Sequence, residues 1–262
     1  MFNKRGQTTI FIIVAIVIVA IVLIAFVVVP RFTKKESPIS EVIDPEAYIT
    51  DCINLELEPL VEEISTKGGY LDPLTAPARC IFYQGICRPY LCYTPNNFEA
   101  CINQEPMLKE HIEKILLEKI REEELVEVCI NNFKNAAQKK GWQTNTCLNP
   151  QYTITLSQGK INIPINCDIT MEKGEETRNI NEFDLFLEWP LFEFVMLTQE
   201  IINKEITNSN FDPLTYMWRN PNIEVIKFSG SNEAEIYTLK LRNREDEFVF
   251  AIRNYVIPQG VL

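Results

Sequence analysis

The eight cysteines are the residues whose type and spacing indicate chemistry most clearly. They are Cys52, Cys80, Cys87, Cys92, Cys101, Cys129, Cys147 and Cys167. An even number of cysteines, all of them after an apolar amino-terminal segment, indicates disulfides formed in an oxidising compartment. The alternatives are reduced, buried thiols or a zinc site, but the spacings between Cys80 and Cys101 do not supply the two paired hooks of a zinc ribbon.

The cysteine positions also predict a pairing, although spacing alone does not determine one. Cys52 and Cys129 each lie within an apolar helical stripe, so they are expected to join two helices. Cys147 and Cys167 are expected to join the start of a sheet to a strand. The four cysteines from 80 to 101 are expected to close locally. Each bridge would stabilise the fold by about 2–4 kcal/mol, mainly by restricting the unfolded chain.

Other side chains with potential chemistry favour structural roles. The acidic runs Glu122-Glu123-Glu124 and Glu245-Asp246-Glu247 could supply the paired carboxylates of a glycosidase, but consecutive acids are typical of solvated turns or helix ends. The single histidine, His111, is expected to be solvated or paired with a glutamate. The chain has no H-E-x-x-H, G-x-S-x-G, P-loop or G-x-G-x-x-G motif. We therefore predict no catalytic residue, no metal, no cofactor and no enzyme activity.

The charge balance restricts the class of partner. The 262 residues include 36 Asp and Glu against 25 Lys and Arg, a formal net charge of −11. Such a surface repels phosphate backbones, so nucleic acid is not expected as a partner.

Residues 10–29 form an unbroken apolar run of isoleucine, valine, leucine, alanine and phenylalanine. A helix of this length covers about 30 Å, the thickness of the hydrocarbon core of a bilayer. A buried core helix and a cleaved secretory signal are the alternatives, but a signal has a shorter apolar region followed by a small-x-small cleavage site. Basic residues flank both ends, so the cysteines decide the orientation. We predict a single-pass protein of the cell membrane, in contact with membrane lipid, whose C-terminal domain is extracytoplasmic.

The residues after this segment alternate between helical and extended patterns. Residues 31–44 read as a linker or stalk. Asp44-Pro45 should begin a helix that Gly68-Gly69 end and Pro59 kinks. Residues 70–104 form a Cys- and Pro-rich insert predicted to be irregular. A helical stretch is predicted from 106 to 140.

From residue 151 the pattern changes to period two, which indicates strands. The predicted elements are a hairpin turned at 157–160, a strand at 182–189, a helix at 191–206, and strands at 222–228, 234–243 and 247–256. The fold class is α+β: one transmembrane helix followed by a disulfide-stapled ectodomain with an antiparallel sheet and helices packed on one face. The expected domains are a basic leader (1–6), the transmembrane helix (7–30), the linker (31–44) and the ectodomain (45–262).

The start Lys4-Arg5-Gly6-Gln7-Thr8-Thr9-Ile10-Phe11 resembles the leader of archaeal type IV pilin-like proteins, of the class III type. In that family a membrane peptidase cuts after the small residue, which the resemblance places between Gly6 and Gln7. The exposed apolar helix can then associate with copies of itself in a filament. Bacterial pilins carry Glu at the fifth mature position, where this chain has Phe11, while archaeal relatives often lack the acid.

A second resemblance covers most of the chain. The start KRGQTTIFII, the cysteine-bearing helix that ends in Gly-Gly-Tyr at Tyr70, and the Cys-Ile-Asn-Asn-Phe sequence at 129–133 are similar to those of uncharacterised membrane-anchored surface proteins of small-genome archaea. The resemblance implies an archaeal cell-surface location. Three functions stay open: an anchored surface protein with a structural or binding role, a pilin-like filament subunit, and an ectoenzyme acting on glycans.

Overall fold

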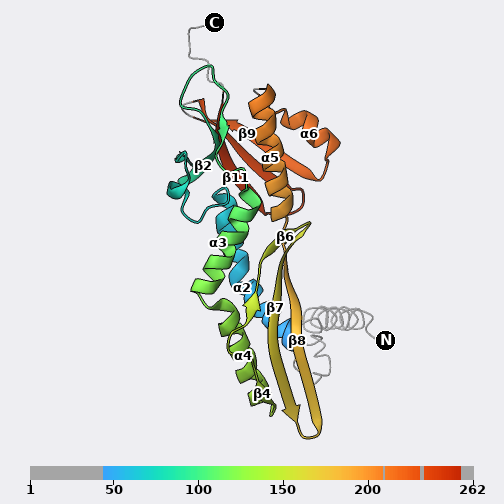
Figure 1. Cartoon of the computed structure of the whole chain (residues 1–262). Coiled ribbons are helices and arrows are strands. Elements are labelled where there is room, and N and C mark those ends of the chain that lie inside the picture. Colours follow the sequence, from blue (N-terminus) through green and yellow to red (C-terminus); the bar gives the residue numbers. More distant parts are fainter. Residues whose placement is uncertain (1–43, 209, 231–232, 255–262) are drawn as a thin grey trace, which may run out of the picture. The chain divides into compact units, whose positions relative to one another are not determined.

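The computed structural model describes residues 44–208, 210–230 and 233–254 (Figure 1). The chain divides into two units, Met1–Ile43 and Asp44–Leu262, and the described residues all belong to the second. The predicted membrane-spanning segment 10–29 and the predicted processing site at Gly6-Gln7 lie outside them. Among the described helices, none has the length and apolarity that a membrane crossing requires.

Helix α2 (Pro45–Thr66) forms as its sequence predicts. The Asp44 carboxylate accepts a 3.1 Å hydrogen bond from the Glu46 amide, which satisfies an otherwise unpaired donor of the first turn. The helix continues through Pro59 and ends where the Gly69 amide donates to the Ile64 carbonyl. Its buried stripe follows the helical repeat and consists of Ile49, Ile53, Leu57, Val61 and Ile64.

The single helical stretch predicted from 106 to 140 is wrong, because the chain forms two helices there. Helix α3 (Leu108–Glu122) and helix α4 (Leu125–Lys139) are separated at Glu124, whose φ of 50° is left-handed. A left-handed residue interrupts the run of helical backbone, and charged residues at the junction remain solvated. The acidic run 122–124 is therefore a helix junction, as its composition indicated.

The first sheet has six strands: β1 (Cys80–Tyr83), β2 (Ile86–Tyr93), β3 (Ile102–Asn103), β9 (Ile223–Ser229), β10 (Glu235–Leu241) and β11 (Glu247–Arg253). Their order is β1-β2-β11-β10-β9, with β3 beside β2. Strands β2 and β11 are parallel and the other pairs are antiparallel. The sheet is therefore mixed, which corrects the purely antiparallel expectation.

The prediction that 70–104 is an irregular insert is also wrong. Strand β2 lies inside the six-stranded sheet and is buried over five consecutive residues. Burial of both faces removes the alternation that reveals a strand in a sequence. Pro89 also argued against a strand at this position, because proline is uncommon within a sheet. The region also contains β1, β3 and a short 3₁₀ turn (Pro73–Thr75).

The second sheet has five strands and was not anticipated as a separate layer. Its strands are β4 (Gln143–Asn145), β5 (Gln151–Tyr152), β6 (Thr155–Ser157), β7 (Lys160–Lys173) and β8 (Glu176–Glu188). Strand β7 pairs antiparallel with each of the others. Strand β8 begins six residues before the predicted 182, because its first half pairs with β7 while largely exposed and therefore lacks the apolar alternation of its second half.

Helix α5 (Leu191–Asn208) forms as predicted, whereas α6 (Pro213–Arg219) was not anticipated. Helix α5 contacts β11 of the first sheet and β6 and β7 of the second. Helix α6 packs against β9, and Figure 1 shows it beside α5. A seven-residue helix is too short for a periodic signal, although Asp212-Pro213 is a helix-start sequence.

All eight cysteines form disulfides. Cys52–Cys129 joins α2 to α4, and Cys147–Cys167 joins the segment after β4 to β7. Cys80–Cys87 and Cys92–Cys101 close locally around β1, β2 and β3. The pairs agree with those expected from the sequence, and the domain is an α+β fold with four disulfides.

Candidate functional site

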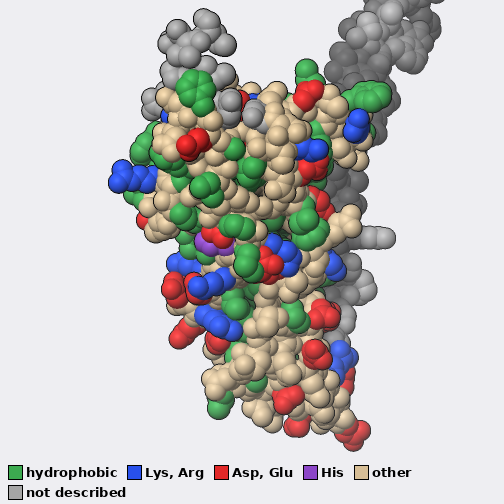
Figure 2. Space-filling model, turned by 45° about the horizontal axis from the view of Figure 1, so that its top comes forward, with side chains coloured by type: hydrophobic (Ala, Val, Ile, Leu, Met, Phe, Trp, Pro, Cys, Tyr) green, Lys and Arg blue, Asp and Glu red, His purple; other side chains and the backbone are tan. Residues whose placement is uncertain are grey.

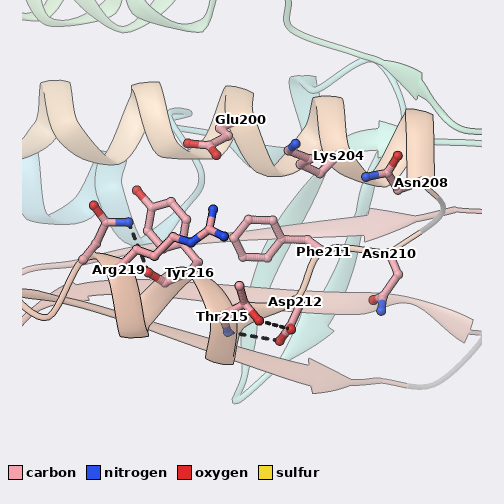
Figure 3. Close-up of a pocket in the computed structure, with 10 residues that line it drawn as sticks. Glu200, Lys204, Asn208, Asn210, Phe211, Asp212, Thr215, Tyr216 and Arg219 are labelled. Carbon is pink, nitrogen blue, oxygen red and sulfur yellow. Dashed lines mark hydrogen bonds between the residues drawn. The ribbon is translucent and has the colours of Figure 1, made fainter.

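A groove lies between α5 and α6. It consists of two adjoining cavities of about 630 and 540 Å³ that share Glu200, Lys204 and Tyr216. The first is also lined by polar and aromatic residues, namely Asn208, Asn210, Phe211, Asp212, Thr215, Arg219 and Asn220 (Figure 3). The second is more apolar and is also lined by Gln158, Phe192, Glu193, Met196, Leu197, Gln199, Asn203 and Ile223.

The α5 wall follows from the helical repeat. Met196, Glu200, Lys204 and Asn208 are spaced by four residues, so they lie along one side of the helix. All four are exposed. The opposite side of α5 packs into the core through residues that include Ile201 and Ile202.

The α6 wall is held by the cap at its start. The Asp212 carboxylate accepts hydrogen bonds from the Leu214 and Thr215 amides and from the Thr215 hydroxyl. The pKa of Asp212 is consequently lowered, chiefly by the Thr215 hydroxyl. The cap orients the helix so that Tyr216 and Arg219 lie below α5 in Figure 3. The Asp212 carboxylate is thus held by hydrogen bonds within the first turn of α6.

The floor of the groove is attached to α5 by Glu205, which is 1% exposed. Its Oε1 accepts hydrogen bonds from the Phe211 amide at 2.9 Å and the Tyr237 hydroxyl at 2.5 Å. Lys227 Nζ lies 3.1 Å from the same oxygen and donates to Asn210 Oδ1 at 2.7 Å. The network therefore fixes the backbone of residues 210–211 beneath the cavity.

Lys227 is shared by two carboxylates whose pKa values move in opposite directions. Burial acts to raise the pKa of Glu205, but the Tyr237 hydroxyl, Lys227 and the Phe211 amide outweigh it and lower the pKa. Glu235, 2.8 Å from Lys227, has its pKa raised by burial and by the charge of Glu205. Burial and the Glu205 charge also raise the pKa of Tyr237, so its phenol stays protonated and donates. These ion pairs and hydrogen bonds connect α5 to strands β9 and β10 of the sheet.

Two cations face the groove without a partner. Lys204 of α5 and Arg219 of α6 are both exposed, and neither side chain forms a hydrogen bond or ion pair with another residue that the structure describes. The nearby Tyr216 hydroxyl is a further donor, and its pKa is raised by burial and by Glu200. The charged half of the groove therefore offers unused positive charge in an otherwise acidic protein.

Apolar side chains remain uncovered on the same helix. Helix α6 has no buried residue, and its Leu214 and Trp218 are 75% and 82% exposed. On the face drawn in Figure 2, hydrophobic side chains gather in the upper part and charged side chains dominate the middle and lower parts. Helix α6 therefore adds uncovered apolar side chains to the surface.

His111 lies elsewhere and is paired with a glutamate. Its Nδ1 is 3.5 Å from Glu105 Oε2, and its ring centroid is 4.5 Å from that of Tyr70. The partner is thus Glu105, which precedes α3, and neither of the flanking acids Glu110 and Glu113. Burial lowers the pKa of His111, which favours the neutral ring.

The acidic run 245–247 ends the turn between β10 and β11, as its composition indicated, with Glu247 as the first residue of β11. It lines a smaller cavity of about 280 Å³ with Glu58 and Glu62. Asp246 pairs with Arg244, and Glu247 with Lys240 at 2.9 Å. Within the described ranges no three His, Cys, Asp or Glu side chains are arranged to hold a metal ion.

The sequence patterns do not predict the groove. Most of its residues come from α5, from the following loop and from α6, which was not predicted; Gln158 and Ile223 come from the β6–β7 turn and β9, and none belongs to a catalytic motif. The Asp-Pro helix start at 212–213 was the one available signal. This chain matches no protein-family model, no curated protein and no solved structure.

Proposed function

We propose that this chain is a membrane-anchored cell-surface protein whose disulfide-linked domain works by binding through the α5–α6 groove. The observation that carries the proposal is the complete pairing of the eight cysteines. Four disulfides in one domain are typical of proteins that fold in an oxidising compartment, outside the cytoplasm.

The sequence supports the anchor. Residues 10–29 contain no polar side chain and are long enough to cross a hydrocarbon core as a helix. All the cysteines follow this segment, so one crossing is sufficient to place every disulfide on the oxidising side. The open groove, its unpaired cations and the absence of catalytic motifs favour binding over catalysis.

The anchor and the orientation are tested together in intact cells. A membrane-impermeant amine reagent should label lysines of the domain, and carbonate extraction should leave the chain in the membrane pellet. Release by carbonate would contradict the anchor. Protection of the lysines until the cells are lysed would contradict the extracytoplasmic orientation.

A pilin-like filament subunit is the second candidate, and the sequence Lys4-Arg5-Gly6-Gln7 directly before the apolar segment favours it. Mass spectrometry of the native amino terminus tests it. A chain that begins at Gln7, together with filaments in sheared cell fractions, would support the filament. A chain that begins at Met1 or Phe2 would exclude processing by a prepilin peptidase.

A further inference from the structure

We propose that the α5–α6 groove binds an extended peptide in which a carboxylate lies beside an apolar side chain. The carboxylate occupies the half between Lys204 and Arg219 (Figure 3). The apolar side chain occupies the half lined by Phe192, Met196 and Ile223. The inference rests on the proposed binding role of the domain and names its ligand class.

Charge complementarity argues for the carboxylate. Lys204 and Arg219 project from the two walls of one cavity, and neither has a partner among the described residues. Arginine presents a planar fork that matches a carboxylate, and lysine adds a point charge. In a chain with an excess of acids, two unpaired cations on facing helices are most simply complemented by an anionic group of a ligand.

Among the described residues, the acidic side chains of the groove form no ion pair with Lys204 or Arg219. Asp212 is the cap of α6 and accepts three hydrogen bonds from its own first turn. Glu193, in the apolar half, accepts a 2.8 Å hydrogen bond from the Gly159 amide. Glu200 is exposed between the halves and can accept a hydrogen bond from a backbone N–H of the ligand.

The second half explains why the ligand must also be apolar. Met196 is 52% exposed at the point where the cavity leaves the charged half. Covering such a surface with a leucine-sized side chain contributes roughly a tenfold gain in affinity or more. A free carboxylate, or a sugar with hydroxyls on every face, would leave this half unused.

Carboxamides on both walls favour a peptide backbone between the two side chains. Asn203 and Asn208 belong to α5. Asn210, before α6, accepts from Lys227 and keeps its Nδ2 as a donor, and Asn220, after α6, donates to the Tyr216 carbonyl and keeps its Oδ1 as an acceptor. An amide side chain both donates and accepts, which is the pairing that alternating backbone N–H and C=O groups require. The cavities of about 630 and 540 Å³ are each within the size range of ligand pockets, roughly 300–1,000 Å³.

The experiment uses the full-length chain in detergent with its disulfides intact and three rhodamine-labelled hexapeptides with blocked ends. The first has Leu next to Glu at its centre, the second has Gln in place of Glu, and the third has Ser in place of Leu. Fluorescence anisotropy should show the first binding about tenfold or more tightly than each of the others. Lys204→Gln and Arg219→Gln should each weaken it by about tenfold.

Matched controls separate the groove from general charge. Lys139→Gln removes an exposed cation on α4 and should leave the affinity unchanged. Arg219→Glu should bind a peptide with Lys in place of Glu better than the parent peptide. Equal binding of the three peptides, unchanged binding by both groove variants, or stronger binding of neutral oligosaccharides or of anionic phospholipid vesicles would overturn the inference. Carbonate extraction and surface labelling are independent of these readouts, so the binding inference can fail while the proposed location holds.

Discussion

The Tyr237 hydroxyl donates a 2.5 Å hydrogen bond to Glu205 Oε1, between a sheet strand and the helix that forms one wall of the groove. Both residues are buried, with exposures of 0% and 1%. The same oxygen receives the Phe211 amide at the floor of the groove. Core packing and groove geometry are therefore coupled through one carboxylate.

Glu205→Ala should lower the free energy of unfolding by about 3 kcal/mol. The substitution leaves the Tyr237 hydroxyl and the Phe211 amide without their acceptor in a buried site. Denaturant unfolding measures the change. Glu200→Ala, which removes an exposed carboxylate from the same helix, should change the free energy of unfolding by no more than about 0.5 kcal/mol. Equal effects of the two substitutions would show that the buried network is not what holds α5.

The two carboxylates that share Lys227 should give opposite pH dependences. The pKa of Glu205 is lowered from 4.5, so its stabilisation is present above that pH and is lost as the pH falls through the folded-state pKa. The pKa of Glu235 is raised from 4.5, so its contribution is greatest below 4.5 and is lost as the pH rises through the folded-state pKa.

The check is the free energy of unfolding from pH 3 to pH 7 for the parent chain, Glu205→Gln and Glu235→Gln. The parent should lose its advantage over Glu205→Gln as the pH falls below 4.5. Its stability relative to Glu235→Gln should instead improve as the pH falls toward 4.5. Parallel curves for the two variants would contradict the assignment.

Removal of the Cys52–Cys129 disulfide should be the most damaging of the disulfide changes. Its cysteines are 77 residues apart, whereas Cys80 and Cys87 are seven apart. Loop-closure entropy gives about 4.5 kcal/mol for the longer loop and about 2.5 kcal/mol for the shorter one. Double Cys→Ala variants unfolded in denaturant provide the comparison, and a larger loss for the local pair would contradict the prediction.

Gly68→Ala should destabilise the fold more than Gly159→Ala, although both glycines have positive φ angles, 61° and 74°. An added Cβ at Gly68 would lie 2.7 Å from Pro89 Cγ and 3.1 Å from the Val249 carbonyl oxygen, whereas at Gly159 it would meet nothing within 4 Å. Both variants carry the backbone strain, but only the first adds overpacking, which costs about 1–3 kcal/mol. Thermal unfolding of the two variants side by side tests the difference, and equal losses would mean that α2 can shift away from β2.

The elements that the sequence predicts well are those whose signals are local. Asp44-Pro45 and Gly68-Gly69 bound α2 by backbone conformations that depend on a few neighbouring residues. The apolar stripes around Cys52 and Cys129 located two facing helices and hence the bridge between them. Alternation from residue 151 onward located most strands of the second half.

The features that were missed depend on contacts distant in sequence. Strand β2 pairs with β1 directly before it, but its place inside the sheet depends on its pairing with β11, more than 150 residues later. The helix break between α3 and α4 could not be predicted from a glycine or proline, because the left-handed residue there is Glu124. The groove was not predicted because Lys204 and Arg219 line the same cavity only in the folded chain, where α6 lies beside α5.

The state of the cysteine thiols in native membranes tests most directly whether the domain is membrane-anchored and oxidised. Cells are treated with a thiol-blocking reagent before lysis, the membrane fraction is reduced, and newly exposed thiols are counted by maleimide-polymer gel shift. The chain should be recovered with the membranes, and all eight thiols should become reactive only after reduction. Recovery in the cytosolic fraction, with thiols that react before reduction, would contradict both predictions.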